Sequence, residues 1–142
     1  GAMLAGKAFA NSPVAAVHAL AYPIGGTFHV SHGLSNSLVL PYVLRFNSVE
    51  AKAAKDYAEL APYVFPKLEV NKGAQAVCAE FIDKLENLSK KLGLPQKLRE
   101  VDIPKDACKK MAKDAMKQTR LLVNNPREVT ENDALNIYQS AW

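Results

Sequence analysis

The stretch AQAVCAEFIDKLENLSKKL, residues 74–92, decides the fold class. Its apolar residues recur at spacings of three and four over about five turns, which is the period of one face of an α-helix. Asn71 is expected to cap the start of this helix, and Gly93 with Pro95 to end it. The apolar positions are Ala74, Val77, Cys78, Phe81, Ile82, Leu85, Leu88 and Leu92. The pattern predicts a long helix with one buried face.

Upstream of this stretch, proline and glycine divide the chain into further helical segments. Ser12 and Pro13 favour the start of a short helix over 14–22, which Pro23 is expected to end before a loop at 25–26. The apolar segment 33–47 predicts a helix that Pro41 kinks or restarts. Another helix is expected from Val49 to about Val64.

Two more helices are expected downstream, and no segment shows the alternation of a strand. One runs from about Pro104 to Leu121, and the last begins at the capping sequence 130–133. Pro126 keeps the segment between them in a loop. The sequence therefore predicts an all-α domain, a bundle of five to six helices.

Composition excludes several classes of protein. The chain has 142 residues, of which 49% are hydrophobic and 23% charged, and a formal net charge of +4, as expected for one globular domain. Acidic residues are interleaved with the lysines, so no basic patch indicates nucleic acid as a partner. No apolar run is long enough to span a membrane, and no signal peptide is apparent. Cys78 and Cys108 lie in apolar patterns, which favours buried, reduced thiols and a cytoplasmic location.

All three histidines lie in one window, VHALAYPIGGTFHVSHG, residues 17–33. His18 falls late in a predicted helix, and His32 falls where the next helix starts. A loop from Pro23 to Ser31 is long enough to bring the two imidazoles side by side. The spacing leaves three interpretations open: half of a divalent metal site, histidines without a ligand role, or a general base.

Two longer stretches resemble a known family. GKAFANSPVAAVHALAYPIGGTFHVSHGLSNSLVLPYVLRFN (residues 6–47) is similar to the signature region of the iron-containing (group III) alcohol dehydrogenases. The tail NNPREVTENDALNIYQSAW (residues 124–142) resembles the C-terminal end of the same family. The resemblance covers the chain from Leu4 onward, so residues 4–142 are expected to be the C-terminal all-α, metal-binding domain. Residues 1–3 look like the remnant of a cleaved tag.

The resemblance implies a fold and a set of cofactors. Members of this family have an N-terminal Rossmann-like domain that binds NAD(P) and a helical C-terminal domain like that of dehydroquinate synthase. Fe(II) or Zn(II) lies in the cleft between them, held by one Asp and three His. Two of these ligands match His18 and His32, and the other two belong to a segment upstream. This chain has no G-x-G-x-x-G motif, so we expect it to be a fragment without the cofactor domain.

The resemblance also implies roles for individual side chains. Phe9 and Leu121 occupy positions that line the substrate pocket. Tyr22 stands where many members carry a histidine that relays a proton; a tyrosine hydroxyl can pass on a hydrogen bond but ionises only near about pH 10. His29 matches no ligand position and is expected to be a loop residue. Tyr42 replaces a histidine that is usual in the family.

The implied function is oxidation of an alcohol to an aldehyde or ketone with hydride transfer to the nicotinamide, in an enzyme whose isolated fragment is expected to be inactive. The expected partners are a small alcohol or aldehyde. The alternative is a helical module that binds a partner or self-associates without catalysis. In that case the apolar cleft face around Phe9, Phe28 and Val30 would form a homo-oligomer.

Overall fold

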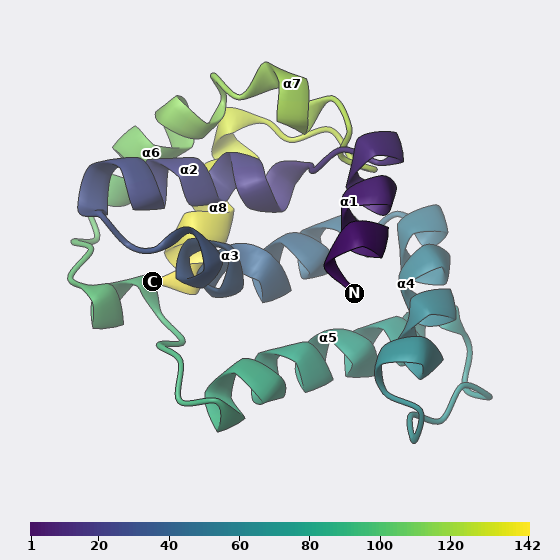
Figure 1. Cartoon of the computed structure of the whole chain (residues 1–142). Helices are drawn as coiled ribbons and strands as arrows, with labels where there is room; N and C mark the ends of the chain where they lie inside the picture. Colours follow the sequence, from purple (N-terminus) through teal and green to yellow (C-terminus); the bar gives the residue numbers. More distant parts are fainter.

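The computed structural model describes residues 1–142, and helices are its only regular secondary structure (Figure 1). None of these helices is both long and apolar enough to cross a membrane. The elements in order are α1 (Ala2–Asn11), α2 (Ala16–Phe28), α3 (His32–Asn47), α4 (Ala51–Val64), α5 (Ala74–Lys91), the 3-10 helix η1 (Leu98–Val101), α6 (Ala107–Ala115), α7 (Thr119–Leu122) and α8 (Glu131–Ala141). The all-α prediction is confirmed.

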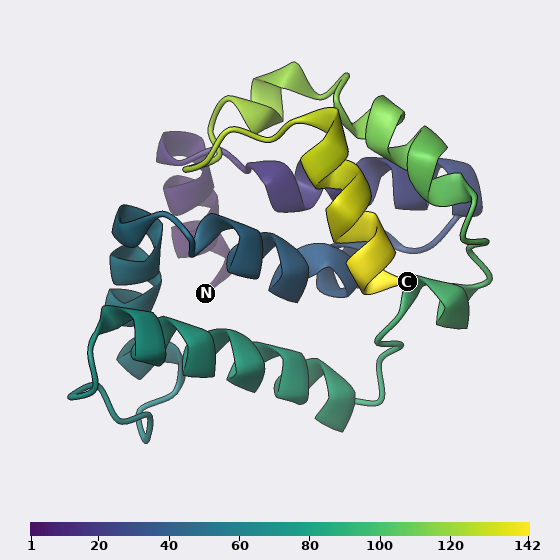
Figure 2. The same cartoon turned by 180° about the vertical axis from the view of Figure 1, so that it is seen from behind.

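The helices form one main core and a smaller side layer. Helices α2, α3, α6 and α8 surround the main core, in which Leu20, Leu38, Met111 and Tyr138 are buried. Helices α4 and α5 pack against each other and have small clusters of their own. Both views place α5 along the outer side of α3, away from α2 (Figures 1 and 2). Helix α3 therefore joins the two layers.

The long helix predicted from its apolar period is confirmed as α5. Its buried residues are Val77, Cys78, Phe81 and Ile82, all on the predicted face. The prediction for its start was wrong, because Gly73, not Asn71, occupies the N-cap position. Gly73 has φ +84°, a conformation that favours glycine, and this backbone path places Asn71 outside the helix. At the other end Gly93 also has a positive φ and accompanies the end of the helix, as expected.

Pro23 does not end its helix, contrary to the prediction, and Pro41 does not restart the next one. Helix α2 continues through Pro23 and both following glycines to Phe28, and α3 continues through Pro41 without restarting. An interior proline costs about 3 kcal/mol. Unwinding at Pro23 would remove Ile24 and Phe28 from the core, and burying such a side chain contributes roughly 1.5–3 kcal/mol. Tertiary packing therefore outweighs the local preference.

The number of helices exceeds the predicted five to six because two short helices were missed. Helix α1 was not foreseen, and Ser12 ends it instead of capping α2. The segment from Pro104 to Leu121 splits into α6 and α7 at a break that has no proline or glycine. The break lets Leu121 and Leu122 pack against the main core.

Candidate metal centre

The connection between α2 and α3 is a short, tight turn, not the long loop predicted over 23–31. Only His29, Val30 and Ser31 separate the two helices. His29 ends α2 with φ 57°, and Ser31 is the N-cap residue of α3. The Ser35 hydroxyl donates a hydrogen bond of 3.0 Å to the carbonyl of Ser31, which ties the turn to the first turn of α3.

Gly25 allows this turn to fold back onto α2. A Cβ atom at this position would lie 3.2 Å from the carbonyl oxygen of Val30, closer than most side-chain contacts. The turn therefore passes directly over the backbone of α2. As a result the first residue of α3, His32, returns to the same face as His18.

The imidazole rings of His18 and His32 lie together, as the sequence predicted. Their centroids are 5.2 Å apart and the ring planes are tilted by 55°. Tyr22 follows His18 by one helical turn on α2, and its ring stacks on His32 at 5.9 Å with an interplanar angle of 29°. The two histidines and Tyr22 thus form one cluster at the start of α3, which we call the histidine cluster.

Burial and a neighbouring imidazole both lower the pKa of His18. Partial burial lowers the pKa of His18 below its ordinary value, and the adjacent His32 lowers it further. His18 therefore stays neutral at physiological pH, which is the protonation state of an imidazole that binds a metal.

His32 is exposed but has a partner on its own helix. The Asn36 side-chain nitrogen Nδ2 lies 3.1 Å from Nε2 of His32, one helical turn further along α3. The amide oxygen of Asn36 is the one buried side-chain polar atom in the molecule without a hydrogen-bond partner. An unpaired buried acceptor thus lies on Asn36, the residue next to the histidine cluster that contacts His32.

The donor set of the cluster fits part of a metal site. Imidazole nitrogen is a suitable ligand for zinc and iron, and catalytic zinc sites usually take three protein ligands or more. No group of three or more His, Cys, Asp or Glu side chains in the structure is arranged to hold a metal ion. The residues present therefore fit two ligands of such a site but do not complete it.

Of the other residues singled out from the sequence, Phe9 and Leu121 lie on helices other than the two that carry the imidazole pair. Phe9 is exposed on α1, while Leu121 is on α7, which packs against α2, and contributes to the main core. Phe28 and Val30 are partly buried against that core, so the expected exposed face around them is reduced to Phe9. His29 lies in the turn, as expected, and takes no part in the pair.

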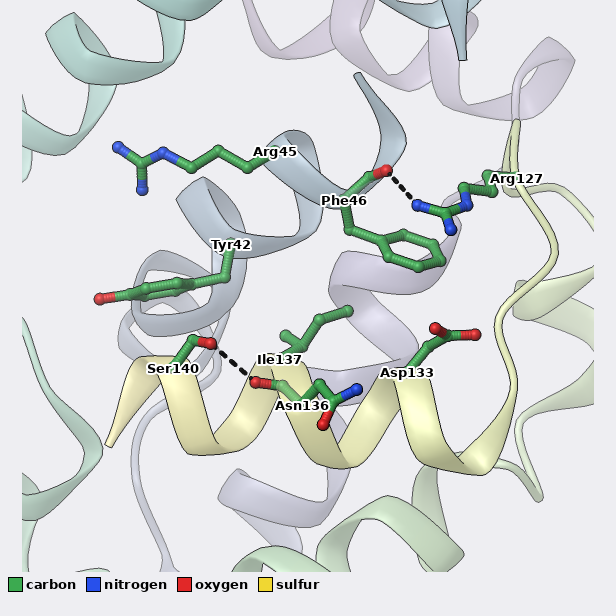
Figure 3. Close-up of a pocket in the computed structure, with 8 residues that line it drawn as sticks. All are labelled: Tyr42, Arg45, Phe46, Arg127, Asp133, Asn136, Ile137 and Ser140. Atoms are coloured by element: carbon green, nitrogen blue, oxygen red, sulfur yellow. Dashed lines mark hydrogen bonds between the residues drawn. The ribbon is translucent and has the colours of Figure 1, made fainter. Parts of the chain in front are cut away.

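A hollow between α3 and α8 was not found from the sequence (Figure 3). It has a volume of about 380 Å³ and contains two arginines. Arg127 donates to the carbonyl oxygen of Phe46 at 2.9 Å and lies 4.0 Å over the Phe46 ring, and Arg45 pairs with Asp83 and Glu86 on α5. Both guanidinium groups are thus engaged in joining segments of the fold. Two of its residues, Tyr42 and Arg127, lie in the stretches that resemble the family, but nothing in either stretch indicated a hollow.

Comparison with known proteins identifies the family. Residues 1–142 match the model of the Fe-containing alcohol dehydrogenase family, C-terminal. The chain belongs to this family, and it corresponds to the family's C-terminal helical domain.

The curated relatives are alcohol dehydrogenases and related reductases. The chain is 39% identical to long-chain-alcohol dehydrogenase 1 of Geobacillus thermodenitrificans, with 100% of this chain and 35% of the relative covered. It is 30% identical to lactaldehyde reductase of Escherichia coli, with 100% of this chain and 36% of the relative covered. The chain therefore spans about a third of the length of these relatives.

A solved structure supports the same assignment. An alcohol dehydrogenase from Oenococcus oeni superimposes with a TM-score of 0.88 at 29% identity, covering 99% of this chain and 36% of that one. The helical fold described above is thus that of the C-terminal part of an alcohol dehydrogenase of this family.

Proposed function

We propose that this chain is the helical, metal-binding part of a nicotinamide-dependent alcohol dehydrogenase, and that His18 and His32 are two ligands of its Fe(II) or Zn(II) ion. One observation carries the proposal: two helices bring the imidazoles of His18 and His32 to 5.2 Å from each other. The remaining ligands and the residues that bind NAD(P) come from polypeptide outside these 142 residues. Two findings support this proposal: the chain matches the C-terminal model of an alcohol dehydrogenase family, and it covers only about a third of its relatives' length.

When bound, a divalent metal at such a site acts as a Lewis acid that polarises the oxygen of an alcohol or carbonyl substrate. His18 contributes a neutral imidazole, because its lowered pKa keeps it unprotonated. Tyr22, whose ring stacks on His32, contributes a hydroxyl that can exchange a hydrogen bond with a substrate oxygen. We assign Phe9 and Leu121 to the walls that meet the carbon chain of the substrate.

Metal titration of the 142-residue chain tests the ligand assignment. We expect weak Zn(II) binding, because two imidazoles are half of a closed coordination sphere. The variants His18→Ala and His32→Ala should each weaken it on the order of tenfold, which corresponds to about 1.4 kcal/mol. The matched control is His29→Asn, which removes the third imidazole but keeps a residue that tolerates a positive φ. Equal affinity in all four proteins would refute the assignment. Tight stoichiometric binding that survives dialysis would instead indicate ligands from a second chain.

An activity assay tests the proposal that the residues that bind the nicotinamide lie outside this chain. The chain alone should not oxidise short alcohols with NAD or NADP in the presence of Fe(II) or Zn(II), because the nicotinamide has no binding domain. Clear steady-state turnover by the purified chain would contradict this part of the proposal.

Self-association is the second candidate function, and the exposure of apolar side chains on α1 favours it. No residue of α1 is buried, and Leu4 and Phe9 on it are 65% and 58% exposed. Exposed apolar side chains on one helix favour docking against a second copy of the chain. Sedimentation at several concentrations should show dimers that Phe9→Ser disrupts and Tyr63→Ser, at an exposed site on α4, does not. A monomer at every concentration would exclude this function.

A further inference from the structure

Asn36 contacts the candidate ligand His32 from within the same helix. The two residues are four apart on α3, so their side chains share one face. The Asn36 nitrogen Nδ2 lies 3.1 Å from Nε2 of His32. On the other side of the amide, the oxygen Oδ1 is buried. The buried oxygen has no hydrogen-bond partner, and the amide presents its NH2 group to the imidazole.

The chemistry of the two groups fixes where the imidazole proton lies. An amide NH2 donates hydrogen bonds and accepts none, and a neutral imidazole has one N–H and one nitrogen with a free lone pair. A hydrogen bond from Nδ2 to Nε2 therefore requires that Nε2 carries no hydrogen, so the proton lies on Nδ1. The partner of one ring nitrogen thus sets the state of the other.

We infer that Asn36 is a positioning residue for His32: its amide N–H holds the imidazole as the Nδ1–H tautomer, in which the lone pair of Nε2 accepts the hydrogen bond from the amide. Tyr22 stacks on the face of the same ring, so the ring is held both at its edge and on its face. For its effect on metal binding this role rests on the proposed function. A metal ion that approaches His32 has only Nε2 available and must displace the Asn36 amide.

Nuclear magnetic resonance of the metal-free chain tests the tautomer directly. Long-range 1H–15N correlation spectra in mildly alkaline buffer distinguish Nδ1–H from Nε2–H for each histidine. We expect Nδ1–H at His32 in the wild-type chain. Asn36→Asp replaces the donor with a carboxylate that only accepts, so His32 should change to Nε2–H. Asn36→Leu removes both functions and should leave a mixture of the two forms.

His29 is the internal control, because it lies in the turn outside the pair and its signals should not change in either variant. An Nε2–H form at His32 in the wild-type chain would overturn the inference, even if a variant failed to fold. The same tautomer in the wild type and in folded Asn36→Asp would overturn it as well.

Zn(II) addition separates this inference from the proposed function. If both hold, Zn(II) shifts the side-chain NH2 signals of Asn36 together with the ring signals of His18 and His32. Zn(II) that shifts the two rings but leaves the Asn36 signals in place would overturn the inference while supporting the metal site. If Zn(II) shifts neither ring, the metal proposal fails, and the tautomer measurement on the metal-free chain still decides the role of Asn36.

Discussion

The hydroxyl of Tyr138 donates a hydrogen bond of 2.6 Å to the backbone carbonyl of Leu20, two residues after His18 on the neighbouring helix α2. Tyr138 is fully buried, and burial raises the pKa of its phenol, so the group stays protonated and remains a donor. Helix α8, near the end of the chain, thus supports the helix that carries a candidate metal ligand.

Removal of this hydroxyl should lower stability modestly. Tyr138→Phe keeps the buried ring but loses a hydrogen bond, so we expect the free energy of unfolding to fall by about 0.5–1.5 kcal/mol. Urea denaturation followed by circular dichroism measures the change. Tyr63→Phe is the control, because Tyr63 is 85% exposed and loss of its hydroxyl removes no buried hydrogen bond. An equal loss in both variants would argue against the bond to Leu20.

A pair of side-chain amides joins the end of α3 to the loop before α8. Its removal should lower the free energy of unfolding more than loss of the Tyr138 hydroxyl does. Asn47 donates to the Asn125 side chain at 3.1 Å and accepts from it at 2.7 Å. Asn47 is only 3% exposed. Asn47→Ala leaves the Asn125 amide without these partners, so we expect a loss of about 2–3 kcal/mol in the free energy of unfolding. Asn87→Ala, at an exposed position on α5, should change it by less than about 0.5 kcal/mol. Similar values for the two variants would contradict the prediction.

The cap of α8 should give the chain a pH-dependent contribution to stability. Thr130 accepts a hydrogen bond from the backbone N–H of Asp133, and the Asp133 carboxylate accepts one from the backbone N–H of Thr130. The hydrogen bond from the Thr130 side chain holds the pKa of Asp133 below its ordinary value of 3.8. Because the folded state has the lower pKa, this stabilisation is fully present above pH 3.8 and is lost as the pH falls through the folded value.

Thr130→Ala should therefore lower the free energy of unfolding by about 1 kcal/mol at neutral pH. The difference from the wild type should shrink in acid, because protonated Asp133 no longer benefits from Thr130. Urea denaturation at neutral pH and at about pH 3 measures both values. A difference that does not depend on pH would contradict the assigned role of the carboxylate.

The two thiols should be unreactive in the folded chain. Cys78 and Cys108 are unpaired and at most 1% exposed, and burial raises the pKa of both thiols. Reaction with a chromogenic disulfide reagent at neutral pH should be slow in buffer and rapid for both thiols in denaturant, because the thiolate is the reactive form. Rapid reaction of either thiol under native conditions would show local opening around α5 or α6.

The sequence predicted the elements whose signals are local and repeated. The apolar period of α5 and the capping sequence of α8 were each sufficient to predict the helix, because each signal involves residues only a few positions apart. The pairing of His18 and His32 was also foreseen, but its premise was wrong: His18 lies in the first turn of α2, not late in a helix, and a short turn takes the place of the long loop. The predicted roles of Tyr22, Phe9 and Leu121 stay predictions.

What could not be predicted depends on contacts between distant segments. Pro23 was expected to end α2, because its local cost was visible while the burial of Ile24 in the main core was not. The role of Asn36 was missed for a similar reason, since an asparagine at the spacing i, i+4 from a histidine gives no distinctive pattern. The hollow between α3 and α8 joins residues about ninety positions apart and left no signal in either segment alone.

Gly25 fixes the spacing of the candidate ligands through main-chain contact. The carbonyl of Val30 rests against the place where any other residue would carry a methylene or methyl group. A Cβ atom at Gly25 would require this carbonyl to move by a few tenths of an ångström. The approach of the turn to the helix that carries His18 is thus limited by the backbone of a residue whose side chain is a single hydrogen atom.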